Sequence, residues 1–147
     1  MRLVVDTNIA FSAILNTNSK IAKIILKPKS GLNLYSTDQL QIEIGNHWNK
    51  LKKISGYSEA ELFKIVALIN QRIRFINVEL IPLKLLLKAE NTVCDIDVDD
   101  AEFVALTEHI KGKLWTGDKD LIKGLKKKGW DKVVTTDSLY KEIFKTA

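Results

Sequence analysis

"RLVVDTNIAFSAIL", residues 2–15, joins a short apolar run to a segment whose apolar residues have helical spacing. The run ends at Asp6, and this order is typical of a buried strand that leads directly into a helix. The segment "KLWTGDKDL", residues 113–121, has the same order, with Asp118 just past its apolar run. We therefore expect two strand–helix units of one sheet, with an aspartate at the end of each strand.

The rest of the sequence continues the alternation of short apolar runs and helical patterns. Strands are expected at 2–5, 32–37, 75–81, 113–116 and 132–136. Helices are expected at 9–15, 19–27, 38–51, 58–73, 83–93, 97–110 and 119–128. This alternation predicts an α/β fold, a twisted parallel sheet with helices on both faces. In such sheets, ligands bind beyond the carboxyl ends of the strands.

Length and composition fit one soluble domain. The chain has 147 residues, 46% of them hydrophobic, which suits a single domain over residues 1–147. The sequence has neither a signal-peptide pattern nor the roughly 18 consecutive apolar residues that span a bilayer, so we expect a cytoplasmic protein. The only cysteine, Cys94, leaves no internal disulfide or thiolate zinc site and is interpreted as a packing residue. Two histidines, His47 and His109, are too few for a histidine-built metal cluster.

Charge is distributed unevenly along the chain. The segment 95–120 holds eight of the eighteen acids and three of the twenty-three basic residues, so it carries −5 while the remainder carries +10. A basic body around an acidic centre is the pattern expected of a protein that attracts a polyanion and handles it with bound cations. An ordinary soluble protein with charged helix ends would also account for it.

Helix geometry separates the aspartates of "DIDVDDAEF", residues 95–103. If Asp97 is the N-cap, it forms a capping box with Asp100, and Asp95 is a surface residue. Adjacent helical residues point about 100° apart, so Asp99 and Asp100 cannot both face one site. Asp100 shares its face with the apolar residues that pack on the sheet. We therefore assign Asp100 to the ligand-binding crevice expected at the carboxyl ends of the strands, and Asp99 to solvent.

Four short motifs, in order, resemble those of the PIN-domain ribonucleases, best known as toxins of bacterial and archaeal toxin–antitoxin pairs. They are "VVDTN", "EI" at residues 43–44, "DDAEFVAL" and "WTGDKDL", and the resemblance covers nearly the whole chain. It implies a PIN-like domain and a homodimer with a cognate antitoxin as partner. It also implies the roles of seven residues: an acidic quartet of Asp6, Glu43, Asp100 and Asp118, with Asn8 and Thr116 as polar helpers and Asp120 as an accessory acid.

The chemistry of these residues agrees with that resemblance. Carboxylate oxygens without imidazole or thiolate ligands suit Mg²⁺ or Mn²⁺, which can activate a water and stabilise the leaving oxygen at a phosphodiester. We therefore expect the quartet to bind the metal and hydrolyse single-stranded RNA. For Glu43, a surface role competes equally with a role in the site.

Two other functions remain open. The first is a phosphatase of the haloacid dehalogenase type, which needs a second aspartate two residues after the first, where this chain has Asn8. The second is a PIN-like module that binds RNA or a partner without cleaving it.

Several basic and aromatic residues are candidates for contacting RNA. They are Lys52, Lys53, Arg72, Arg74, Lys123, Lys126, Lys127 and Lys128, with Trp48, Trp115 and Trp130 as possible stacking platforms. Trp48 and Trp115 lie in patterns typical of core residues, and the lysines at 126–128 also suit the carboxyl end of a helix.

Overall fold

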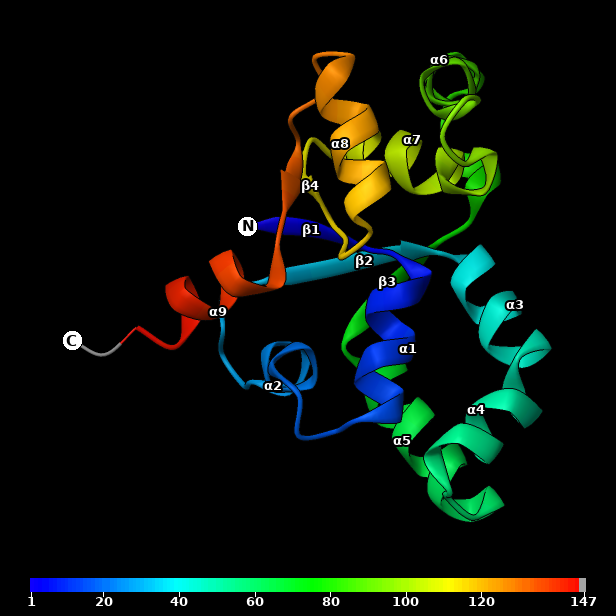
Figure 1. Ribbon diagram of the computed structural model, residues 1–147, viewed down its shortest axis with the longest axis vertical. Coiled ribbons are helices and arrows are strands. Elements are labelled where there is room, and N and C mark those ends of the chain that lie inside the picture. Colours follow the sequence, from blue (N-terminus) through cyan, green and yellow to red (C-terminus); the bar gives the residue numbers. More distant parts are fainter. Residues whose placement is uncertain (146–147) are drawn as a thin grey trace.

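A five-stranded, all-parallel sheet is the centre of the computed structural model, which describes residues 1–145. Its spatial order is β3-β2-β1-β4-β5. The strands are β1 (Arg2–Val5), β2 (Asn33–Thr37), β3 (Ile73–Ile76), β4 (Lys113–Trp115) and β5 (Val133–Val134). Because β1 is the central strand, its carboxyl end lies between those of β2 and β4, as Figure 1 shows.

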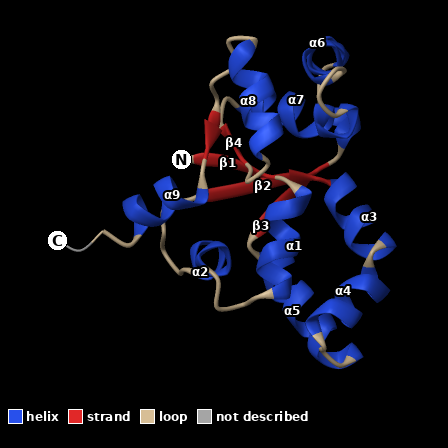
Figure 2. Cartoon of the chain, viewed as in Figure 1, coloured by secondary structure: helices blue, strands red, loops and turns tan. Residues whose placement is uncertain are grey.

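Helices cover both faces of this sheet, as predicted (Figures 1 and 2). On one face lie α6 (Leu83–Val93), α7 (Ala101–Ile110) and α8 (Lys119–Lys127). On the other lie α1 (Thr7–Leu15), α2 (Lys20–Leu26), α5 (Glu59–Gln71) and α9 (Thr136–Ile143). The remaining helices, α3 (Asp38–Asn46) and α4 (Trp48–Ser55), follow the carboxyl end of β2. Two 3₁₀ turns, η1 (Val78–Leu80) and η2 (Val98–Asp100), complete the described chain.

The alternating side chains of the central strands divide the core in two. Leu3 and Val5 pack into the cluster under α1, α2 and α5, whereas Val4 faces the cluster formed with α6, α7 and α8. The adjacent strand repeats this pattern, because Trp115 joins the first cluster and Leu114 the second. A strand buried on both faces explains why "RLVV" is nearly continuous in apolar residues.

Several elements differ from those that the sequence predicts. The helix expected over 38–51 is two helices, because His47 leaves the helical conformation at φ −106° and ψ 16°. The strand expected over 75–81 begins and ends earlier, at Ile73–Ile76, and is followed by η1. Helix α9 was not predicted, since its eight residues have few strong helix formers. In contrast, α5 begins close to its predicted start, with a capping box in which Ser58 and Glu61 bond to each other's backbone N–H groups.

Two single-residue interpretations also need correction. Cys94 is exposed rather than packed in the core, with its thiol donating to the carbonyl oxygen of Asn91 at 3.4 Å. Trp48 is only half-buried, although Trp115 is fully buried as expected. Both exceptions lie at or near a helix end, where apolar periodicity predicts burial poorly. Within residues 1–145, no helix is long and apolar enough to cross a membrane.

Candidate functional site

The ends of β1 and β4 bring two of the predicted aspartates to the same edge of the sheet. Val5 is paired with Trp115, so Asp6 and Thr116 are the next residues on two adjacent parallel strands. Asp6 is the N-cap of α1 and accepts a hydrogen bond from the N–H of Ile9 at 2.9 Å. This cap fixes the Asp6 carboxylate where the strand ends.

Asp118 is held in a similar way at the start of α8. Its carboxylate accepts hydrogen bonds from the N–H groups of Asp120 at 3.0 Å and Leu121 at 3.1 Å. Its own N–H donates to the hydroxyl oxygen of Thr116 at 3.1 Å. Asp6 and Asp118 therefore each cap a helix at the same edge of the sheet, where the crevice was expected, and the buried Thr116 is hydrogen-bonded to both.

Burial makes the Asp6 carboxylate costly to ionise. Asp6 is only 3% exposed, and this burial raises its pKa above the ordinary value. Hydrogen bonds from the Thr116 hydroxyl and the Ile9 N–H oppose the increase, and the nearby charge of Asp118 adds to it. Asp6 is therefore a buried acid next to a second aspartate, and no basic side chain of residues 1–145 forms an ion pair with it.

Asp100 lies near both of these aspartates and comes from the same layer of helices as α8. It ends η2 directly before α7, and the predicted capping box does not form: the Asp97 carboxylate accepts from the N–H of Asp99, whereas the Asp100 N–H donates to the Asp97 carbonyl oxygen. Desolvation, together with the charges of Asp97, Asp6, Asp118 and Asp99, raises the pKa of Asp100 to about 7. Asp97 is thus a cap, as predicted, but of a 3₁₀ turn.

Glu43 stands apart from this group. It lies on α3, accepts a hydrogen bond from Gln39 Nε2 at 2.9 Å, and has its second carboxylate oxygen 3.5 Å from His47 Nδ1. The charge of Glu43 does not contribute to the raised pKa of Asp6 or of Asp100. The structure therefore gathers three members of the predicted quartet and leaves the fourth at a distance.

The predicted helpers are distributed over both sides of the crevice. Asn8 is exposed and lines a cavity of 520 Å³ with Glu43, between α1 and the α3–α4 pair. Asp120 is exposed in the first turn of α8 and borders a different cavity with Asp95 and Lys123. Of the three helpers, only Thr116 contacts the aspartates through its own side chain.

The donor chemistry fits a hard divalent cation, although the ligands are not preassembled. Asp6, Asp100 and Asp118 supply only carboxylate oxygens, the ligand type that Mg²⁺ and Mn²⁺ prefer. Across residues 1–145, no group of three or more Asp, Glu, His or Cys side chains is close enough together to hold a metal ion. A cation at this edge would offset the repulsion that raises the pKa of Asp100.

One further acidic pair at this edge was missed by the sequence analysis. Glu102 lies on α7, where the Thr37 hydroxyl donates to its carboxylate at 3.5 Å. Desolvation raises its pKa, and the charge of Asp38 raises it further. The only sequence signal for Glu102 was its place two residues after Asp100, and the contact with β2 depends on tertiary packing.

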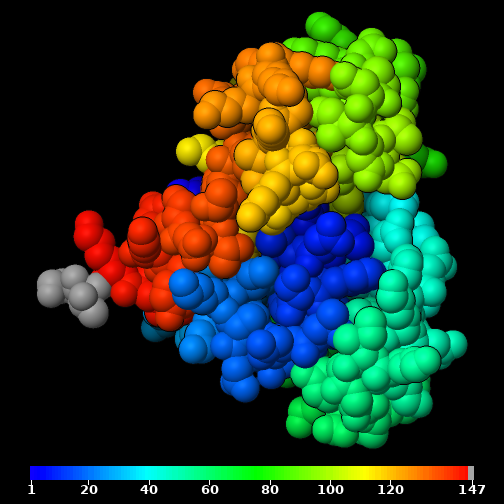
Figure 3. Space-filling model, in the orientation of Figure 1, coloured from blue at the N-terminus to red at the C-terminus, as the bar shows by residue number. Residues whose placement is uncertain are grey.

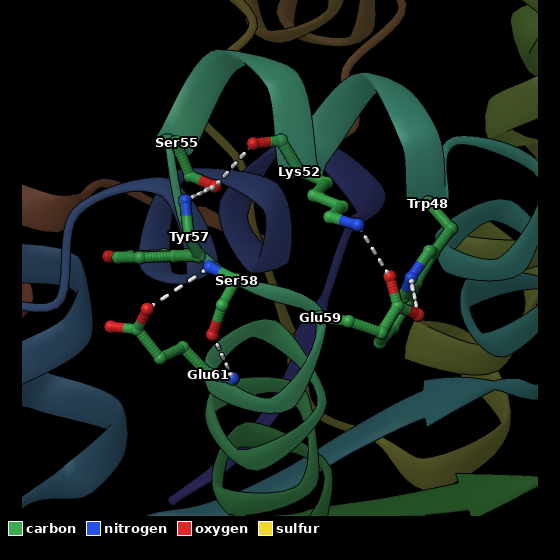
Figure 4. Close-up of polar contacts among 7 residues, drawn as sticks. All are labelled: Trp48, Lys52, Ser55, Tyr57, Ser58, Glu59 and Glu61. Carbon is green, nitrogen blue, oxygen red and sulfur yellow. Dashed lines mark hydrogen bonds and ion pairs between the residues drawn. The ribbon is translucent and has the colours of Figure 1, made fainter.

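Several candidate RNA contacts have structural partners instead. Lys52 forms an ion pair with Glu59 at 3.0 Å, and the indole N–H of Trp48 donates to the same carboxylate at 2.8 Å, which ties α4 to the start of α5 (Figure 4). Lys128 bonds to Asp95 and to the carbonyl oxygen of Thr92.

The other aromatic candidates are also engaged. The indole N–H of Trp115 donates to Thr136 at 3.0 Å, and that of Trp130 donates to Glu108 at 2.8 Å. The indole N–H of each of the three tryptophans is therefore bonded within the protein, and none of them offers a free N–H to RNA.

Solved structures share this fold at low sequence identity. A chain of the VapBC2 complex from Rickettsia felis, solved bound to a DNA fragment from their promoter, aligns with a TM-score of 0.69 and 15% identity, over 92% of this chain and 98% of that one. PAE2754 from Pyrobaculum aerophilum aligns with a TM-score of 0.63 and 13% identity, over 99% of this chain and 91% of that one. No curated protein matches in sequence. The sequence model described as the PIN domain matches residues 4–138, a span that contains both strand-end aspartates, and the chain accordingly belongs to the PIN-domain family.

Proposed function

We propose that this protein is a metal-dependent endoribonuclease that hydrolyses phosphodiester bonds of single-stranded RNA. PIN domains are generally nucleases, and they generally use divalent metals. The observation that carries the proposal is the meeting of Asp6, Asp100 and Asp118, from three separate segments, at one edge of the sheet, where burial and the charges of Asp6 and Asp118 contribute to the raised pKa of Asp100. Uncompensated carboxylates in a crevice are a feature of functional sites.

In this proposal Asp6, Glu43, Asp100 and Asp118 are the ligands of Mg²⁺ or Mn²⁺. The bound ion would activate a water and stabilise the charge of the leaving oxygen. The protein's own part is positioning: the backbone N–H groups of Ile9 and Leu121 hold two of the carboxylates at the strand ends. Thr116 keeps these two aspartates in register, and Asn8 and Asp120 extend the polar surface on either side.

The biological setting follows from the same family. We infer that the protein is the toxin of a type II toxin–antitoxin pair, acts in the cytoplasm and forms a homodimer. Its similarity in fold to a chain of VapBC2, a toxin–antitoxin complex, supports an antitoxin as partner. The excess of basic over acidic residues, a net +5, supports a polyanionic substrate.

A second candidate, a module that binds RNA or a partner without cleaving it, is favoured by one observation. Glu43 is hydrogen-bonded to Gln39 and lies outside the aspartate group. A phosphatase of the haloacid dehalogenase type is not supported, because Asn8 occupies the position of its second aspartate and is itself exposed.

The test combines cleavage with metal binding. Purified protein should cleave labelled single-stranded RNA with Mn²⁺ and not with chelator, and Mn²⁺ at a hundred times its dissociation constant should stabilise the folded protein by about 2.7 kcal/mol. Asp118→Asn should lose both effects, whereas Asp137→Asn on α9, which removes a surface ion pair with Lys20 of α2, should keep both. Stabilisation by Mn²⁺ without cleavage of any RNA would favour the binding module.

A further inference from the structure

A cavity of 520 Å³ lies beside the carboxylate crevice, between α1, α3 and α4. Its volume is within the range of sites that enclose small organic groups. Thr7 and Asn8 line it and directly follow Asp6, the N-cap of α1, so the cavity adjoins the aspartate site through the first turn of α1. Figure 3 shows α1, in dark blue, between the start of α8, in yellow-orange, and α3 and α4, in cyan and green.

The walls of the cavity combine an aromatic face with polar edges. The Phe11 ring contacts His47 edge-on, with ring centroids 5.6 Å apart and an interplanar angle of 62°. Apolar side chains such as Ile54, which is 60% exposed, continue the wall, and Ser12 and Asn8 add hydrogen-bonding groups. This is the surface on which a planar group with polar edges would be stacked and recognised.

The orientation of His47 is fixed by Glu43. His47 Nδ1 lies 2.9 Å from the Glu43 carbonyl oxygen and 3.5 Å from its carboxylate. The other ring nitrogen, Nε2, makes no hydrogen bond within residues 1–145. His47 therefore presents a positioned hydrogen-bonding group at the mouth of the cavity, next to the Phe11 face.

Lys50 supplies an available positive charge at the same place. It is exposed on α4 and lines the cavity, and within residues 1–145 no carboxylate is close enough to form an ion pair with it. Lys52, on the same helix, is paired with Glu59 (Figure 4). Lys52 thus holds α4 in position, whereas Lys50 is free to contact an anion.

We propose that this cavity binds one unstacked nucleobase of the RNA, from a nucleotide next to the phosphate at the aspartates, with Lys50 on the RNA backbone. This inference rests on the proposed function, because it takes RNA to be the substrate. A nucleobase stacks on Phe11 and bonds to His47 Nε2, Asn8 or Ser12 through its edge. The free lysine and the continuity with the carboxylates favour a nucleotide over an apolar protein segment.

The experiment measures binding separately from cleavage. Single-stranded RNA oligonucleotides, each with one abasic position, are titrated with the wild-type protein in chelator, and dissociation constants are read by fluorescence anisotropy. One position should stand out, with binding weakened about 10-fold by loss of the stacked base. In Phe11→Leu that position should no longer differ from the others, while in the control Phe63→Leu, an exposed aromatic on α5 outside the cavity, it should still stand out.

A second variant guards against misfolding of Phe11→Leu. Ser12 is exposed and lines the cavity, so Ser12→Leu fills it from the surface and should also remove the abasic effect. With Mn²⁺, both variants should raise KM with little change in kcat, since neither residue belongs to the carboxylate set.

The outcomes separate the two proposals. An abasic effect that depends on Phe11, in a protein that cleaves no RNA, supports the nucleobase site and contradicts the endoribonuclease. Cleavage by a protein in which every abasic position has the same effect in wild type and Phe11→Leu overturns the nucleobase site alone. The nucleobase site is also overturned if the wild-type protein binds no RNA. It is overturned as well if Ser12→Leu keeps its binding to RNA but loses binding to a protein partner.

Discussion

The aspartates and Glu43, on either side of the start of α1, are held by different means. On one side Asp6 and Asp118 follow paired strands and cap the helices that come next, so strand register and backbone hydrogen bonds place them. On the other side Glu43 comes from the middle of α3 and is bonded to Gln39 and His47, which belong to the same chain segment. The aspartate side carries unrelieved charge, whereas the glutamate side is already satisfied. We therefore expect the aspartates to dominate metal binding and the glutamate side to serve substrate recognition.

The largest expected effect is on cleavage, and it tests whether the aspartates contribute more than Glu43. Asp6→Asn should reduce cleavage by about 10³-fold, since it removes a charge at the point where the transition state is stabilised. Asparagine can still cap α1, so the fold should remain. Glu43→Gln should cost only about 10-fold, because a glutamine at that position keeps much of its local hydrogen bonding. Initial rates with Mn²⁺ and thermal melts measure both effects, and equal losses in the two variants would show that the sides are equivalent.

A second prediction concerns the packing that places η2 on the aspartate side. A Cβ added at Gly124 of α8 would lie 2.5 Å from Cδ1 and 2.8 Å from Cγ1 of Ile96, just before Asp97, whereas one added at Gly45 of α3 would meet nothing within 4 Å. Both substitutions gain helix propensity, but only Gly124→Ala overpacks. Its free energy of unfolding should therefore be about 1 to 3 kcal/mol below that of Gly45→Ala by urea denaturation. Recovery in the double variant with Ile96→Ala is expected, and failure to recover would exclude this contact as the cause.

The third prediction concerns how stability depends on pH. The contributions of Asp100 and Asp95 to the free energy of unfolding should change with pH in opposite directions. The folded-state pKa of Asp100 is raised to about 7, so between about pH 4 and 7 the folded protein retains a proton that the unfolded chain has lost. Its stability penalty is then fully present above pH 7 and disappears toward pH 4. In chelator, Asp100→Asn should be more stable than wild type at pH 8 by about 1 kcal/mol, after allowance for solvent screening, and equal to it near pH 3.5.

Asp95 is the matched control for this measurement. Its ion pair with Lys128 lowers its pKa, so its contribution to stability is present above the unfolded value and lost as pH falls. Asp95→Asn should therefore be less stable than wild type at pH 8, and the difference should vanish in acid. The same sign in both variants would contradict the assignment of Asp100 to the crevice.

The smallest expected effect compares the two lysines of α4. Lys52→Gln removes the ion pair with Glu59 and should lower the melting temperature by about 1 °C or less, because exposed ion pairs contribute little. Lys50→Gln should leave the melting temperature unchanged and instead weaken RNA binding, with a smaller dependence on salt. If Lys52→Gln has the larger effect on RNA binding, the division of roles within α4 is wrong.

Features whose position depends on local chemistry could be predicted from the sequence. The strand ends at Asp6 and Asp118 could be predicted because an apolar run, a capping residue and a helix are all encoded within a few residues. The starts of α5 and α6, expected at residues 58 and 83, could be predicted for the same reason, because Ser58 caps the first helix and Pro82 precedes the second.

Features that depend on tertiary packing could not be predicted. The apolar spacing of 38–51 continues through His47, so nothing in that pattern indicated the break that separates α3 from α4 and orients Glu43. The contact of Glu102 with Thr37 joins residues 65 positions apart. The site assignments that depend on such contacts, above all Glu43 and Asp120, stay predictions.

The central position of β1 has a consequence for synthesis on the ribosome. Chains emerge from the amino terminus, so β1 is translated long before β4, the strand at residues 113–115 with which it pairs. Asp6 and Asp118 therefore cannot come together until translation has passed residue 118. A nascent chain that ends before that residue lacks the aspartate site, so if the protein is a toxin, the ribosome that makes it is not exposed to its activity until then.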